Sequence, residues 1–377
     1  MKVAVPRETS PGERRVALAP ESCKKLVAKG MEVLVESGAG GASFFTDDSY
    51  RAVGAKIESD AGSLWSAADF MLTVQPPTVE QVALLRQGSY LLGSLLPIKN
   101  LPVVKALADR KITAFSTDCV PRTTRGQAMD TLSAMANIAG YKAVLIAANE
   151  LSKYFPMFMT AAGTIFAAKV FVIGAGVAGL QAIATAKRLG ATVVATDTRR
   201  VVAEQIQSVG GKFVGVDSDE DAQTTSGYAK ELSAEFYRKQ GELIAQQCAL
   251  NDVVITTALI GGVKAPRLIG ADAVRKMQPG SVIVDLAAEA GGNCELTKPG
   301  QTVIENGVKI VGPLNLPSEM PRDASTLYSR NLATFLTTFW KDGKFNLDFE
   351  DDILKNAVVT HDGAVRHQAS RTALGVG

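Results

Sequence analysis

A glycine-rich turn constrains this chain more than any other feature of its sequence. Gly174, Gly176 and Gly179 form a Gly-x-Gly-x-x-Gly pattern directly after the apolar run Lys169–Ile173. In such a pattern the first glycine permits a tight turn, the second lets backbone approach a pyrophosphate, and the third lets the helix pack on the strand. The helix that follows offers N–H groups and a positive dipole end to phosphates. The turn therefore predicts a dinucleotide-binding βαβ unit.

An acidic residue follows the next predicted strand, Thr192–Thr196. Asp197 lies 18 residues after Gly179, where a carboxylate accepts hydrogen bonds from the adenosine ribose hydroxyls. The same charge repels a 2′-phosphate, which favours NAD over NADP. Arg199 and Arg200 are close enough to accommodate that phosphate, so NADP stays an alternative. A Rossmann-like domain that binds no nucleotide also fits the pattern.

Short apolar strands alternate with helices along both halves of the chain. Strands are predicted at Val3–Pro6, Met31–Glu36, Phe70–Val74, Ile112–Ser116, Lys169–Ile173, Thr192–Thr196, Lys212–Val216, Asp252–Ala258, Ser281–Ala287 and Val308–Gly312. This alternation is typical of parallel sheets that are covered by helices on both faces. At 377 residues the chain has room for about two domains. We therefore predict an α/β fold of two Rossmann-like domains, with mostly parallel doubly wound sheets and a nucleotide cleft between them.

The order of these elements also suggests domain boundaries. We expect residues 1–125 and 326–377 to form the first domain, because the amphipathic helix predicted at Ser325–Trp340 can return the chain to it. Residues 140–320 would form the NAD(H)-binding domain, with connecting segments at 126–139 and 321–325. A long helix is expected between about Met129 and Phe155. The polar stretch Asp217–Gly227 is either a lid or a surface loop.

Composition excludes several classes of function. Forty basic and 38 acidic residues give a net charge of +2, which offers no electrostatic argument for nucleic acid binding. The four cysteines are scattered, and Cys294, which has no partner base, is expected to be a packed residue. The two histidines, His361 and His367, both lie in the tail, which excludes histidine-based metal sites and triads over the first 360 residues. We expect a soluble protein of a reducing compartment, with no metal.

A second polar cluster precedes the long helix. Arg122, Gln127, Asp130 and Ser133 follow one another at spacings of five, three and three residues. One interpretation is a capped helix start with a solvated polar face. The other is a cluster that holds a carboxamide and a ribose, because glutamine and aspartate accept hydrogen bonds from an amide NH2 and an arginine can fix the aspartate.

Several longer runs resemble a known family. The runs are PGERRVALAPE, MTAAGT, GAGVAGLQAIATAKRLGA, SGYAKE, ITTALI and DLAAEAGGNCE, and together they span essentially the whole chain. They resemble the NAD(H)-binding component of proton-translocating NAD(P) transhydrogenases, which is a separate soluble alpha subunit in bacteria that split the enzyme. The resemblance implies hydride transfer between NADH and NADP. It also implies a homodimer, an NADP(H)-binding beta subunit, membrane-spanning partners, and a cytoplasmic location at the inner membrane.

The same resemblance implies roles for particular residues. They are a loop beside the dihydronicotinamide at Arg122, Gln127, Ala128, Met129, Asp130 and Ser133; a pyrophosphate contact at Val177; adenosine contacts at Asp197, Thr198 and Arg199; a closing loop at Gly227 and Tyr228; and the remaining pocket at Gln240 and Leu259.

Alanine dehydrogenase shares the implied fold and many of these runs. It oxidises an amine, so it needs a general acid/base and a group that holds the substrate carboxylate. In that family a lysine stands in a V-K-E-P-like run, and a histidine follows some twenty residues later. Here Gln75 takes the place of the lysine, and Leu91–Leu96 contains no histidine. Alanine or saccharopine-type oxidation is therefore disfavoured, and a non-catalytic NAD-sensing module is the other alternative.

Overall fold

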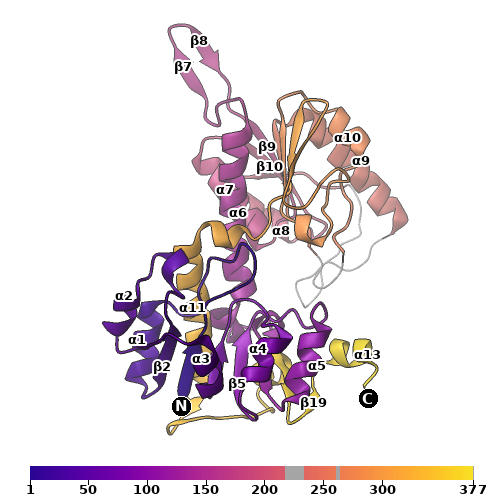
Figure 1. Ribbon diagram of the computed structural model, residues 1–377. Coiled ribbons are helices and arrows are strands. Elements are labelled where there is room, and N and C mark those ends of the chain that lie inside the picture. The colour runs from indigo at the N-terminus through magenta and orange to yellow at the C-terminus, as the bar shows by residue number, and fades with distance from the viewer. Residues whose placement is uncertain (217–232, 260–263, 377) are drawn as a thin grey trace. The chain divides into compact units, whose positions relative to one another are not determined.

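The computed structural model describes residues 1–216, 233–259 and 264–376 and divides the chain into two compact units (Figure 1). Unit 1 comprises Met1–Met135 and Pro317–Gly377, and unit 2 comprises Ala136–Leu316. Each unit contains one large, mostly parallel sheet. The predicted α/β class with two parallel sheets is confirmed.

The sheet of unit 1 has the strand order β19-β18-β6-β5-β4-β1-β2-β3. Its first six strands in the chain run parallel, in the order 3-2-1-4-5-6 typical of a doubly wound fold. The tail adds β18 antiparallel to β6 and β19 antiparallel to β18. The strands are β1 Lys2–Val5, β2 Glu32–Glu36, β3 Lys56–Glu58, β4 Phe70–Leu72, β5 Tyr90–Gly93, β6 Thr113–Ser116, β18 Val358–His361 and β19 Ala364–Val365. The sequence prediction missed β3, β5 and both tail strands.

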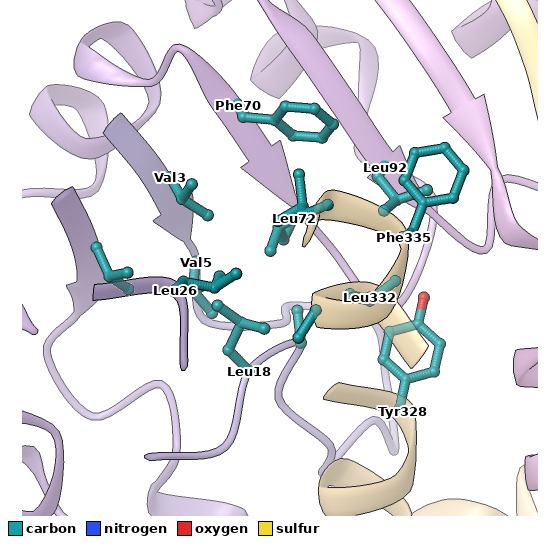
Figure 2. Packing of buried hydrophobic residues seen from close by; sticks show 14 of the residues in the cluster. Val3, Val5, Leu18, Leu26, Phe70, Leu72, Leu92, Tyr328, Leu332 and Phe335 are labelled. Carbon is teal, nitrogen blue, oxygen red and sulfur yellow. The ribbon is translucent and has the colours of Figure 1, made fainter. Parts of the chain in front are cut away.

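Helices cover both faces of this sheet. They are α1 Pro20–Ala28, α2 Asp47–Arg51, α3 Ala61–Ala67, α4 Val79–Leu84, α5 Leu101–Asp109, α11 Pro321–Thr338, α12 Asp352–Ala357 and α13 Gln368–Leu374. Figure 2 shows the side chains of Tyr328, Leu332 and Phe335, which come from α11, beside Leu72 and Leu92 of the central strands. The helix predicted to return the chain to its first half is thus α11, and it packs in the core of unit 1.

The two histidines belong to this added tail. His361 lies at the end of β18, where its Nδ1 is 3.0 Å from the hydroxyl of Thr113. His367 caps α13 by accepting a hydrogen bond from the backbone N–H of Ser370. Burial lowers the pKa of both imidazoles. Both side chains therefore have local structural roles within unit 1.

The sheet of unit 2 repeats the same order with one strand added. Its strands run β11-β10-β9-β12-β13-β15-β14, all parallel except β14. They are β9 Lys169–Ile173, β10 Thr192–Thr196, β11 Lys212–Phe213, β12 Val253–Thr256, β13 Val282–Asp285, β14 Thr302–Glu305 and β15 Val308–Val311. The six predicted strands are confirmed, with shorter bounds for several, and β14 was missed.

Both faces of this second sheet are buried, as the continuous apolar strands predict. Val170 and Val172 of β9 pack with α6 Thr131–Glu150, α7 Val177–Arg188 and α8 Val202–Ser208. Phe171, between them, packs on the other face against α9 Ala234–Leu250 and α10 Ala271–Arg275. Helix α6 has the length and hydropathy of a membrane span, but helices in protein cores can share both properties.

A two-stranded hairpin projects from unit 2 (Figure 1). It consists of β7 Phe158–Thr160 and β8 Gly163–Ile165, paired antiparallel. Met159 and Phe166 are 70% and 73% exposed. A shallow groove of about 590 Å³ lies in the same unit and is lined by Tyr154, Phe155, Pro156, Leu189 and neighbouring residues. Exposed apolar side chains on a short projecting ribbon are typical of a contact with another chain.

Candidate nucleotide-binding site

The glycine-rich turn of unit 2 has the geometry that each of its glycines predicts. Gly174 follows β9 with φ +95°, a conformation that L side chains rarely adopt. A Cβ on Gly179 would clash with the carbonyl oxygen of Gly174, so a side chain there would push helix α7 off the strand. A Cβ on Gly176 would meet nothing within 4 Å. The turn is therefore crowded at its two outer glycines and open at the central one, where backbone would approach a ligand.

Helix α7 begins at this open glycine. Its N-cap is Gly176, which has no side chain to accept hydrogen bonds from the first turn. The end of the 12-residue helix thus keeps backbone N–H groups for another acceptor. Gly140 of α6 backs the same turn, because a Cβ there would clash with the carbonyl oxygen of Ala178. This arrangement fits a pyrophosphate at the helix N-terminus.

The acid at the end of β10 lies beside this turn. One carboxylate oxygen of Asp197 accepts a 2.8 Å hydrogen bond from the backbone N–H of Ala175. The Arg199 guanidinium donates to both carboxylate oxygens, from Nε at 2.9 Å and from Nη2 at 3.0 Å. The predicted adenosine residues Asp197, Thr198 and Arg199 are half-buried, consecutive and next to the turn. The sequence did not predict the ion pair between Asp197 and Arg199.

Two loops at the carboxyl ends of β12 and β13 complete this edge of the sheet. The buried Asp285 accepts hydrogen bonds from the Thr256 and Thr297 hydroxyls and from two backbone N–H groups. The Asn293 side chain accepts from the backbone N–H of Ala258 and donates to its carbonyl oxygen. These buried contacts fix the chain directly after β12, at the point where ligands bind in open parallel sheets.

The remaining predicted pocket residues of unit 2 have mixed positions. Leu259 follows β12 and is 50% exposed, whereas Gln240 is buried on α9. Val177 is 39% exposed at the start of α7. Gly227 and Tyr228 lie outside the described residues. Cys294 is buried, and burial raises the pKa of its thiol, which agrees with the predicted packing role.

The polar loop before α6 belongs to unit 1 and begins the long helix with a cap. One Asp130 oxygen accepts from the backbone N–H of Ser133 at 2.8 Å, and the other accepts from the Ser133 hydroxyl at 2.6 Å. The capped helix start is therefore present for these two residues. Arg122 and Gln127 have exposed side chains on the same loop. Ala128 is exposed and Met129 is buried.

Contacts with the C-terminal tail hold this loop. The Arg125 guanidinium pairs with Asp351 and Asp352. The side-chain amide of Asn331 donates to the carbonyl oxygen of Ala128 at 2.9 Å. Sequence reasoning missed both contacts, because the partners lie more than 200 residues away in the chain and follow no motif. The tail thus positions the backbone of the polar loop.

A buried ionic cluster in unit 1 was also missed. Arg15 and Glu13 form a bidentate pair, and the Gln75 amide donates to Glu13 at 2.7 Å. Burial alone would raise the pKa of Glu13, but the hydrogen bonds and charge of Arg15, with further hydrogen bonds, lower it to about 2. Glu8 accepts from the backbone N–H groups of Val74 and Gln75, and burial raises its pKa to about 7. Glu8 and Gln75 line a cavity of about 190 Å³.

Comparison with known proteins places this architecture in a family. Residues 4–139 match the alanine dehydrogenase/PNT N-terminal domain, and residues 143–368 match the alanine dehydrogenase/PNT C-terminal domain. The chain belongs to this family. It is 50% identical over 378 aligned residues to an NAD(P) transhydrogenase subunit alpha of Rhodospirillum rubrum, covering 98% of each chain. A crystal structure of transhydrogenase from Sinorhizobium meliloti matches with a TM-score of 0.88 and 44% identity, covering 97% of this chain and 100% of that one.

Within the family the similarity is graded. An alanine dehydrogenase of Staphylococcus aureus is 32% identical over 88% of this chain and 85% of its own. The transhydrogenase relatives are thus closer than this amino-acid dehydrogenase over a longer stretch of the chain. Family membership agrees with the resemblance expected from the runs around Gly174 and Asp197. Where that resemblance expects a substrate-binding lysine in alanine dehydrogenases, the structure has the neutral Gln75, engaged with Glu13.

Proposed function

We propose that this chain is the NAD(H)-binding component of an NAD(P) transhydrogenase, which exchanges hydride with NADP(H) bound on a partner. The observation that carries the proposal is the open, uncapped turn at Gly176, with Asp197 beside it, in a chain of this family. The reaction is NADH + NADP⁺ ⇌ NAD⁺ + NADPH. The C4–H bond of one nicotinamide breaks, and the hydride with its electron pair forms the C4–H bond of the other.

The residues of the chain then have positioning roles. The turn at Gly174–Gly179 binds the pyrophosphate, and Asp197 accepts hydrogen bonds from the ribose. Gln127 and Asp130 orient the nicotinamide ring, with Arg122 and Ser133 supporting them and Ala128 and Met129 contributing backbone. Gly227 and Tyr228 close over the nucleotide, and Thr198, Gln240 and Leu259 complete its pocket.

No proton is gained or lost at the reacting carbons, so no general acid or base is needed. Catalysis depends on holding the two carbons about 3–3.5 Å apart and on excluding water. This agrees with the neutral side chain at position 75 and with a chain whose histidines have structural partners. The nucleotide-binding domain is residues 140–320, with residues 1–125 and 326–377 as the other domain.

We also propose an assembly. Two copies form a homodimer through the exposed β7–β8 hairpin, whose apolar residues Met159 and Phe166 fit the apolar groove near Phe155 of a second copy. The dimer binds an NADP(H)-carrying beta subunit and membrane-spanning components that couple hydride transfer to proton translocation. The chain itself is cytoplasmic and lies at the inner membrane through these partners.

One specific observation supports a second function. Glu8 lines a cavity and has a pKa of about 7, which is suitable for a general acid or base in amino-acid oxidation. Against this, both Glu8 oxygens accept backbone hydrogen bonds that fix the turn after β4. An NAD-sensing module without catalysis is the third possibility.

A single assay separates these functions. The chain is mixed with NADH, NADP⁺ and the purified NADP(H)-binding component of a transhydrogenase, and hydride exchange is followed. We expect exchange only when both proteins are present. Alanine-dependent formation of NADH by this chain alone would instead establish amino-acid oxidation. NADH binding with neither reaction would establish a non-catalytic module.

A further inference from the structure

The ion pair at the end of β10 fills the carboxylate that the ribose needs. A carboxylate offers about four acceptor positions. On Asp197 the backbone N–H groups of Ala175 and Arg199 take two, at 2.8 and 2.9 Å. The Nε and Nη2 of Arg199 take the other two. The site is also sheltered, since the side chains of Arg199 and Asp197 are 19% and 8% exposed.

Only two of these four donors are able to leave. The backbone N–H of Ala175 belongs to the glycine-rich turn, and that of Arg199 belongs to the segment after β10, so both stay with the fold. The guanidinium is on a flexible side chain. A ribose diol has two hydroxyl donors, and the guanidinium occupies two acceptor positions. Binding of the diol at Asp197 therefore requires the Arg199 side chain to withdraw.

We propose that Arg199 determines the dinucleotide specificity of this site, by competing with the ribose hydroxyls for Asp197 and by providing a cation for a 2′-phosphate. The proposal rests on the proposed function, because it takes Asp197 as the ribose acceptor. A withdrawn guanidinium remains tethered two residues from Asp197, beside the ribose. Guanidinium binds phosphate strongly through paired N–H donors. The pair thus weakens NADH binding and reduces discrimination against NADPH.

The test is the ratio of the dissociation constants for NADPH and NADH, measured by fluorescence titration of the full chain. Arg199→Met keeps the length of the side chain and removes its charge and donors, so we expect tighter NADH binding, weaker NADPH binding and a ratio at least tenfold higher. Asp197→Asn removes the repulsion and releases the guanidinium, so the ratio should fall at least tenfold. The double variant Asp197→Asn/Arg199→Met should lose the gain in NADPH binding.

A matched control is the neighbouring Arg200→Met, because Arg200 is exposed and has the same charge. We expect a ratio within twofold of the original chain. Thermal unfolding by circular dichroism confirms that each variant is folded, and Arg199→Lys, which keeps the charge but not the paired donors, should give an intermediate ratio. A merely structural ion pair would weaken both dinucleotides equally in Arg199→Met and leave the ratio unchanged, which overturns the proposal. So would a ratio that responds to Arg200→Met and not to Arg199→Met. Failure of the original chain to bind NADH would overturn the proposed function itself.

Discussion

Replacement of the buried Glu8 by glutamine should change the stability of unit 1 with a sign that depends on pH. Burial raises the pKa of Glu8 from 4.5 to about 7. An acid with a raised pKa in the folded state stabilises the fold below its unfolded pKa, and that contribution is lost as the pH rises through the folded value. A difference of 2.5 units corresponds to about 3 kcal/mol. The original chain should therefore lose about this much of its unfolding free energy from Glu8 between pH 4.5 and pH 8.

Glutamine does not titrate, but it has one acceptor oxygen where glutamate has two. Both Glu8 oxygens accept backbone hydrogen bonds, from Val74 at 2.6 Å and from Gln75 at 3.2 Å, so the variant loses one. That loss costs about 1 kcal/mol. At pH 5 the Glu8→Gln variant should be about 1 kcal/mol less stable than the original chain, and at pH 9 about 2 kcal/mol more stable. The crossover lies in the interval where Glu8 titrates.

Tryptophan fluorescence in urea reports this unit selectively. The chain has two tryptophans, and Trp65 and Trp340 both lie in unit 1. The control is Glu350→Gln, which removes the same charge from an exposed position of unit 1 and should give a difference that is flat with pH. The reasoning is refuted if the difference between Glu8→Gln and the original chain is also flat from pH 5 to pH 9, or if the variant becomes relatively less stable as the pH rises.

Three further outcomes are expected. Gly179→Ala should destabilise unit 2 by about 1–3 kcal/mol through the clash with Gly174, seen as a lower melting temperature by circular dichroism; Gly176→Ala, which faces open space, should melt normally but bind NADH weakly, and equal melting of both variants would contradict the packing argument. Gln127→Asn should slow single-turnover hydride transfer more than it weakens NADH binding, because it misplaces the ring; a pure loss of affinity would remove Gln127 from that role. Met159→Glu in the hairpin should shift the sedimentation of the chain from dimer to monomer, whereas Ile304→Glu on β14, also exposed in unit 2, should not; an unchanged Met159→Glu dimer would exclude the hairpin contact.

The sequence predicted the architecture where the signal is local. The continuous apolar run of β9 predicts a strand buried on both faces, and Val170 and Phe171 do pack on opposite faces. The glycine pattern likewise predicted a crowded turn with one open position. Strands such as β14 were missed because half of their side chains are exposed and their pairing depends on β15.

The candidate site was predictable in its residues but not in their partners. Asp197 follows from its distance to the glycine pattern, whereas its bidentate contact with Arg199 depends on side-chain direction, which spacing does not encode. The contacts of Arg125 with Asp351 and of Asn331 with Ala128 depend on the return of the tail to unit 1. The pKa of Glu8 depends on burial around a cavity, which no local motif reports.

The central claim is direct hydride exchange between two nicotinamides, and one isotope measurement tests it most directly. NADH carrying deuterium at the transferred C4 position is mixed with NADP⁺, this chain and the NADP(H)-binding partner component, and the NADPH formed is analysed by mass spectrometry. The account predicts that the NADPH carries one deuterium at C4 and that none is lost to water. NADPH without deuterium, or no NADPH at all with both components folded and nucleotide-bound, would contradict it.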